Sequence, residues 1–194
     1  GKRFVQRPAV EAVLEARKPC YEAFPLRFAI FYDLISAYLG IDAPGYADPI
    51  RQALHSLEHD VPRSGEDHFL LEDSKRAFAL ALEDLDAAEA ATLRSMRLAD
   101  EAGEEHSAAH HSAFNYCGLC TVTFKRGDWE RLGENAAAGE QAARRIGYKM
   151  QISECQMWSA LLALRSGDEA RARPLRRQAI SRVSRLKRPP SASW

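Results

Sequence analysis

The dipeptide Gly-Asp occurs twice in this chain, at Gly127-Asp128 and Gly167-Asp168. Each copy ends one run of helically spaced apolar residues and begins another. Glycine accepts the left-handed backbone angles that end a helix, and aspartate caps the helix that follows. The two copies repeat with a period of about 40, and such a period with turn residues at fixed positions is typical of stacked helical hairpins.

A second set of helix ends follows these turns at one constant interval. Gly147 follows Gly127, Gly103 follows Glu83, and Lys187 follows Gly167, each at the same distance along the chain. The second helices are therefore expected to be equal in length, with a glutamate at the turn of the second hairpin. The pattern predicts an all-α stack of about four antiparallel helical hairpins, at 22–60, 66–102, 105–146 and 150–187. We expect one repeat domain over 1–187, followed by a tail at 188–194.

The first hairpin is predicted from local signals. Apolar residues recur every three or four positions over 22–39, and Gly40 is expected to end that helix. Asp48-Pro49 is expected to begin the partner helix, with Asp as the cap, and Val61-Pro62 to end it. A further short helix is expected at 8–18. No segment alternates with period two for long, so no strand is predicted.

Composition excludes several classes of protein. The 194 residues are 46% hydrophobic and 28% charged, as in globular domains. Charges interrupt every apolar run well before the roughly 20 residues that cross a bilayer, so no membrane span is expected. Four cysteines do not indicate a disulfide framework, which favours a reducing, cytoplasmic setting. Gly1-Lys2-Arg3 lacks an initiator Met and a signal sequence, so we expect a processed or excised fragment.

The formal net charge of zero hides a strong asymmetry. The segment 171–194 carries eight basic side chains and no acid, so the segment 1–170 carries a net charge of −8. Such separation steers charged partners and also favours contact between molecules, so a homodimer is a further possibility.

One segment carries a family resemblance. Tyr116, Leu119-Cys120 and Gly127-Asp128-Trp129 supply an aromatic residue, Leu before a small residue, and a Gly-Asp-aromatic turn. This order resembles the first helix and turn of a tetratricopeptide repeat. The next unit matches at its small and turn positions, Ala160, Ala163, Gly167-Asp168, Ala172 and Ala179. The unit is longer than that family's usual length of about 34 residues, and it resembles the longer units of bacterial signalling and transcription regulators. Glu83 at a turn and Pro174 early in the last helix depart from the family pattern.

The resemblance implies a right-handed superhelical stack whose first helices line a concave groove that receives a peptide. Carried over by matching turns, the groove residues would be Phe114, Cys117, Thr121, Lys125, Met157, Leu161 and Arg165. Lys125 and Arg165 each stand two residues before a turn glycine and could together bind a carboxylate. The alternative is that both cap helix C-termini and that Thr121, Met157 and Leu161 are core. The expected function is a non-catalytic module that binds a protein or peptide, and the long units suggest a bacterial regulator.

The basic C-terminal helix leaves a second function open. Its apolar stripe is Leu175, Ala179, Val183 and Leu186, and its remaining face carries Arg176, Arg177, Arg182 and Arg185. As a closing helix it would seal the stack. As a binding surface it would contact nucleic acid, an anionic membrane, a small ligand or an acidic partner. No aromatic residue lies between these arginines, which disfavours single-stranded nucleic acid.

Metal binding and catalysis are the remaining alternatives. His106, His110 and His111, with Cys117 and Cys120 further along the same predicted helix, offer zinc-ligand chemistry. A Cys pair three residues apart inside a helix also fits small apolar packing. No nucleophile elbow, phosphate loop or His-Glu-x-x-His motif occurs. We therefore expect no catalytic residue, metal or cofactor, with a zinc-dependent enzyme or zinc-stabilised domain as the alternative.

Overall fold

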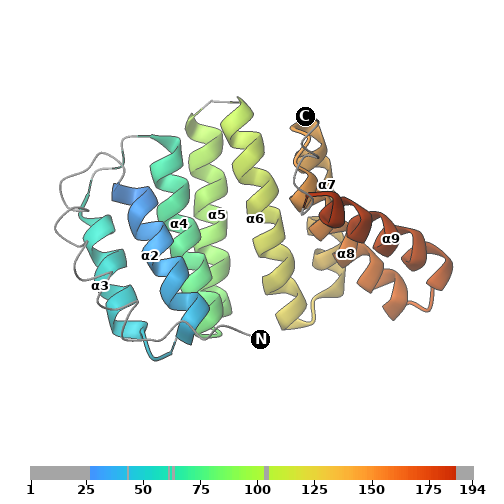
Figure 1. The fold of residues 1–194 in the computed structure, drawn as a ribbon, viewed down its shortest axis with the longest axis horizontal. Helices are drawn as coiled ribbons and strands as arrows, with labels where there is room; N and C mark the ends of the chain where they lie inside the picture. Colours follow the sequence, from blue (N-terminus) through green and yellow to red (C-terminus); the bar gives the residue numbers. More distant parts are fainter. Residues whose placement is uncertain (1–26, 43, 61, 63, 103–104, 187–194) are drawn as a thin grey trace, which may run out of the picture.

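The described part of the chain, residues 27–42, 44–60, 62, 64–102 and 105–186 of a computed structural model, folds into eight α-helices and no strand. The helices are α2 (Arg27–Asp42), α3 (Ala47–Glu58), α4 (Gly65–Ala81), α5 (Leu85–Ala102), α6 (Glu105–Arg126), α7 (Trp129–Arg145), α8 (Lys149–Arg165) and α9 (Glu169–Leu186). They are stacked from α3 at one end to α9 at the other (Figure 1). The predicted all-α stack of hairpins is confirmed, whereas the helix expected at 8–18 lies outside the described residues.

The helices contact one another in a regular order. Helices α4 and α5, α6 and α7, and α8 and α9 form closely packed hairpins, and α2 packs on both α3 and α4. Each first helix also contacts the next first helix, from α2 to α4 to α6 to α8. Among the described helices, none of the second helices α3, α5, α7 and α9 contacts another. The first helices therefore form a continuous inner row, and the second helices lie apart from one another.

The corners of the second, third and fourth hairpins repeat one backbone geometry. The left-handed region holds Glu83 (φ 61°), Gly127 (φ 72°) and Gly167 (φ 78°). The amide of the next residue donates back across the end of the first helix, as from Asp128 to the Thr123 carbonyl at 2.9 Å. The carboxylate of that Asp then accepts from the amide three residues on, at 2.9 Å for Asp84, 3.2 Å for Asp128 and 2.9 Å for Asp168.

Two predictions for the first hairpin are wrong. Helix α2 continues through Gly40 to Asp42, because Gly40 does not take a left-handed φ. The Asp42 carboxylate instead accepts from the Gly45 amide at 3.2 Å and closes the following turn. Helix α3 begins at Ala47 rather than at Pro49, and Asp48 does not cap it. The Asp48 side chain pairs with Arg51 one turn along the helix, at 2.7 Å.

The second and third hairpins are joined by ion pairs near their corners. Lys125 lies 3.4 Å from Glu83, and Arg126 lies 2.5 Å from Asp86. The Glu89 carboxylate forms ion pairs with both Arg126 and Arg131, and its oxygen lies 2.6 Å from Arg131 Nη2. Hydrogen bonds from Arg126 and Arg131 hold the pKa of Glu89 below its ordinary value. The acidic segment after Glu83 thus balances basic side chains of the next hairpin.

The third and fourth hairpins are joined by small and aromatic side chains. Cys117 and Cys155 bring their Sγ atoms within 3.7 Å of each other between α6 and α8. Gly139 permits this approach, since a Cβ there would lie 2.8 Å from Tyr116 Cβ and 2.9 Å from Cys155 Sγ. Nearer the corner, the Phe124 ring centroid lies 5.7 Å from that of Trp129 and 5.2 Å from that of Trp158.

Replacing glycine by alanine should have opposite effects on stability at a left-handed corner and within a helix. Because an L-residue in the left-handed region costs about 1–2 kcal/mol, Gly127→Ala should lower the free energy of unfolding by about 1 kcal/mol. Gly40→Ala, at an exposed position within a helix, should raise it by about 1 kcal/mol. Glu83→Gly should be about 1 kcal/mol more stable than Glu83→Ala, since both remove the same exposed ion pair. Urea unfolding followed by circular dichroism checks all four variants.

Gly139 should resist enlargement while a nearby glycine on the same helix accepts it. Overpacking costs about 1–3 kcal/mol, so Gly139→Ala should be destabilised within that range. Gly133→Ala is the matched control, since its Cβ would meet only Leu162 at an ordinary 3.6 Å. Helix propensity should make that variant more stable by about 0.5–1 kcal/mol. Equal effects of the two substitutions in thermal unfolding would contradict the close contact.

Candidate partner-binding surfaces

The predicted groove residues of α6 do not all reach a surface. Phe114 is half-buried, and its ring lies 5.8 Å from that of Phe69 and 5.4 Å from that of Tyr148. Cys117 is only 5% exposed and lies in the contact between α6 and α8. Thr121 is half-buried and donates its hydroxyl to the Cys117 carbonyl at 3.2 Å. Of these three residues, Cys117 is the one that a partner cannot reach.

Two of the predicted groove residues of α8 differ in exposure. Leu161 is half-buried on α8. Met157 is 44% exposed, and its side chain lines a hollow between α8 and α9. Leu161, one turn further along α8, does not line this hollow.

Lys125 and Arg165 hold equivalent places but are not brought together as one site. Lys125 pairs with Glu83 in the preceding hairpin. The Arg165 guanidinium lies over the Trp129 ring, 4.0 Å from its centroid. Each cation thus contacts a side chain of the preceding hairpin, which is a structural role, and each also stays partly open to a partner.

The histidines and cysteines of α6 are occupied by packing. His110 contacts Phe114 and Tyr148, with ring centroids 5.1 and 4.9 Å away. His111 is buried, stacks on Phe69 at 4.2 Å and lies 3.0 Å from a Glu66 carboxylate oxygen. The side chain of His106 lies outside the described residues. Within the described part of the chain, no three His, Cys, Asp or Glu side chains gather to hold a metal ion.

The thiols are not poised for nucleophilic chemistry. Hydrogen bonding with Cys155, together with burial, raises the pKa of the Cys117 thiol above its ordinary value. Burial likewise raises the pKa of the Cys120 thiol. A nucleophilic cysteine needs the opposite shift, toward thiolate at neutral pH. The described cysteines are therefore small apolar packing residues in this structure.

One partly buried polar cluster links the first three hairpins. The Tyr32 hydroxyl donates to Asp73 at 3.0 Å, and Arg76 Nε donates to the same carboxylate at 2.8 Å. Burial and Asp73 raise the pKa of Tyr32 to about 12. Gly118 of α6 leaves room for the Arg76 side chain, which would lie 2.8 Å from a Cβ there. These groups satisfy one another, so the cluster specifies helix packing.

The hairpin of α8 and α9 carries two hollows. The apolar hollow, of about 300 Å³, is lined by Met150, Ser153, Glu154, Met157, Ala179, Ile180, Val183 and Ser184. The arginine hollow, of about 130 Å³ and close to the corner, is lined by Leu164, Glu169, Ala172, Arg173 and Arg176. Met150 and Ile180 are 51% and 54% exposed, and large apolar side chains gathered in this way are typical of a surface that receives a partner.

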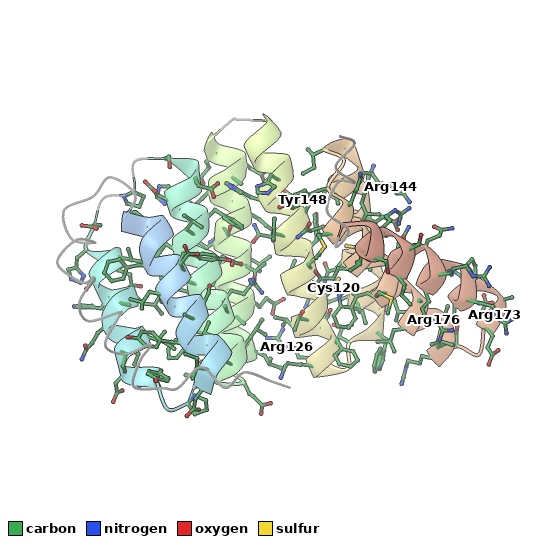
Figure 2. All side chains as sticks on the ribbon, viewed as in Figure 1. Cys120, Arg126, Arg144, Tyr148, Arg173 and Arg176 are labelled. Atoms are coloured by element: carbon green, nitrogen blue, oxygen red, sulfur yellow. The ribbon has the colours of Figure 1, made fainter. Side chains whose placement is uncertain are left out.

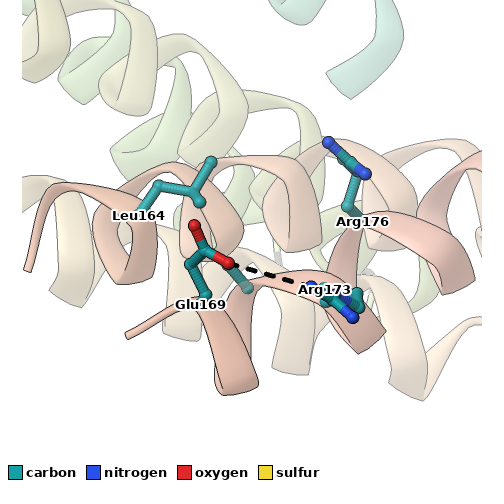
Figure 3. A pocket seen from close by; sticks show the side chains of 5 residues that line it. Leu164, Glu169, Arg173 and Arg176 are labelled. Carbon is teal, nitrogen blue, oxygen red and sulfur yellow. Dashed lines mark ion pairs between the residues drawn. The ribbon is translucent and has the colours of Figure 1, made fainter. Parts of the chain in front are cut away.

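The predicted basic face of α9 is exposed at Arg176 and Arg177, whereas Arg182 is half-buried and donates to Gln156 Oε1 of α8. Arg173 and Arg176 lie at the far end of the stack, away from the first hairpins (Figure 2). Arg173 is 3.8 Å from Glu169, while Arg176 points away from that pair (Figure 3). The predicted inner stripe packs on α8 through Ala179, which is buried, and Leu175, which is half-buried.

Sequence reasoning missed the hollows as sites. It treated Val183 and Ala179 only as an inner stripe and did not single out Met150 or Ile180. A signal was present, because residues one repeat period earlier can be compared directly across the Gly-Asp turns. In that comparison Arg173 and Arg176 stand where α7 has Gly133 and Ala136.

Neither protein-family models, nor curated proteins, nor solved structures match this chain. The tetratricopeptide resemblance therefore stays a prediction that depends on the residues quoted for it. None of the helices in the described part of the chain is both long and apolar enough to cross a lipid bilayer.

The buried thiols should resist modification in the folded protein. Because Cys117, Cys120 and Cys155 are buried and the first two have raised pKa values, iodoacetamide at pH 8 should leave all three unmodified for hours. All three should react within minutes in guanidinium concentrated enough to unfold the chain. Peptide mapping by mass spectrometry gives the extent at each position. Rapid native alkylation of Cys117 would contradict the packing described.

Proposed function

We propose that this chain is a non-catalytic module that binds a peptide or protein partner along the row of first helices α4, α6 and α8. The observation that carries the proposal is the order of helix contacts, in which first helices touch in succession and second helices do not. Such a row offers one extended surface to which several hairpins contribute. The resemblance to tetratricopeptide repeats, in which this face receives peptides, supports the same surface.

The side chains on this row suit a partner with apolar and acidic groups. Leu161 and Thr121 are half-buried, and Lys125 and Arg165 stand at equivalent places beside them. Cys117 is left out of the proposed surface because it is buried. A role in a bacterial signalling or transcription-regulating protein is part of the proposal and follows from the long repeat unit alone.

A displayed library of random 16-residue peptides, selected on the folded protein, tests the proposal. Selected peptides should bind the parent protein, and Leu161→Glu should weaken them about tenfold or more, because it places a charge in the apolar contact. Leu93→Glu on the second helix α5 is the matched control, since Leu93 is 40% exposed away from the row. That variant should bind within about twofold of the parent.

Three results would count against the proposal. Selection could yield no peptide, or Leu93→Glu could weaken binding as much as Leu161→Glu. The third is preferential binding of a short single- or double-stranded nucleic-acid probe at moderate salt. If Arg176→Glu with Arg177→Glu removed that binding, nucleic acid rather than a peptide would be the ligand.

A further inference from the structure

The repeat period that separates Gly127 from Gly167 gives the end surface of α8 and α9 a counterpart inside the stack. Residues of α6 and α7 that lie one period before the hollows are already covered by a helix, and that helix is α8. Comparing the two sets shows what the exposed end is shaped to receive.

The apolar hollow corresponds to the surface of α6 and α7 that contacts the first half of α8. One period earlier, its lining residues correspond to His110, Ala113, Phe114, Cys117, Gly139, Glu140, Ala143 and Arg144. Ala113 and Ala143 pack on Ile152. Cys117 and Gly139 contact Cys155, and Glu140 accepts from Gln156 at 2.8 Å. His110 and Phe114 contact Tyr148. All of these counterparts but Arg144 thus contact α8 or the residue before it.

The arginine hollow corresponds to the surface of α6 and α7 that contacts the second half of α8. Its counterparts are Phe124, Trp129, Leu132, Gly133 and Ala136. Phe124 contacts Trp158, and Leu132 and Ala136 pack with Trp158 and Leu162. Gly133 faces Leu162, and Trp129 receives Arg165. Each of these counterparts therefore contacts α8 in the interior of the stack.

We propose that the end surface of α8 and α9 is a docking site for an amphipathic helix of a partner protein, with apolar residues in its first half and carboxylates in its second half. A helix that lay as α8 lies on α6 and α7 would begin over Met150 and Val183 and would end over the arginine hollow. The proposal rests on the proposed function in taking the molecule as a partner-binding module, but it uses a different surface.

The chemistry of the partner follows from where the two surfaces differ. Arg173 and Arg176 replace the small Gly133 and Ala136, so the positions that receive Leu162 and Trp158 in the interior here present guanidinium groups. Carboxylates on the incoming helix at those two places would form charge-assisted pairs with them. Ile180 replaces Glu140, so the first half of the incoming helix meets a more apolar surface than α8 does.

Charge also disfavours two other occupants. A second copy docked on the same face with its helices parallel would bring its own Arg173 and Arg176 toward those of the first copy, and like charges oppose that contact. The segment 187–194 contains Lys187 and Arg188 but no Asp or Glu. It therefore lacks the side chains that the arginine hollow selects.

The probe is a synthetic, fluorescein-labelled peptide that spans 148–166 with Trp158→Glu, Leu162→Glu and Cys155→Ala. The two glutamates fall where Arg173 and Arg176 lie, and alanine makes room for Met157, which is larger than its counterpart Cys117. One comparison peptide keeps Trp158 and Leu162, and another carries lysine at both places. Fluorescence anisotropy with the full chain reports binding.

The diglutamate peptide should bind the parent protein more tightly than either comparison peptide, and salt should weaken it. Arg173→Glu with Arg176→Glu should reduce its affinity about tenfold or more, and Ile180→Asp should do the same. Arg177→Glu is the matched control, because Arg177 is exposed on α9 but lines neither hollow. It should change affinity by less than about threefold. The dilysine peptide should in turn prefer the Arg173→Glu, Arg176→Glu protein.

Absence of binding by the diglutamate peptide would overturn the inference, as would equal effects of Arg177→Glu and the double substitution. Loss of binding in Leu161→Glu alone would also overturn it, yet would support the proposed first-helix surface. Sedimentation that shows a dimer of the parent, and a monomer for Ile180→Asp, would assign the surface to a second copy instead. Circular dichroism of every variant excludes loss of fold as the cause.

Discussion

The corners of the second, third and fourth hairpins each join a residue in the left-handed region to an aspartate that caps the next helix. The first residue ends one helix at a defined carbonyl, and the second begins the next at a defined amide, so neither helix can slip along the other. Because Glu83, Gly127 and Gly167 repeat this geometry at nearly equal spacings, side chains at matching positions meet matching neighbours. The ion pairs, the thiol contact and the terminal hollows all depend on that register.

Helix ends were predictable to within a few residues wherever they depend on such local chemistry. Gly40 shows the limit, because the same residue type continues a helix when the chain turns only after Asp42. The orientation of α6 was less predictable than its length. Cys117 faces α8 rather than an open groove because Gly139 lets Cys155 come close, and that contact spans two hairpins. Of the predicted site residues, Met157 reaches a hollow only because α9 packs beside it.

Equivalent backbone positions in the stack carry side chains of different chemistry. Trp129 and Glu169 each stand two residues after a turn glycine, and each meets a cation. Trp129 lies under Arg165 of the next hairpin, whereas Glu169 lies 3.8 Å from Arg173 on its own helix. The backbone repeat thus defines where contacts form, while the residue at each place defines their strength and their selectivity. This separation explains why a repeat pattern predicts architecture well and partners poorly.

The contacts between the second and third hairpins differ in chemistry from those between the third and fourth. Near their corners, the second and third hairpins are joined by exposed or half-exposed ion pairs. The third and fourth hairpins are joined by sulfur, small and aromatic side chains. Dissolved salt screens the first kind of contact, and strongly hydrated salts reinforce the second. Dissolved salt should therefore weaken the ion pairs between the second and third hairpins without weakening the apolar contacts between the third and fourth.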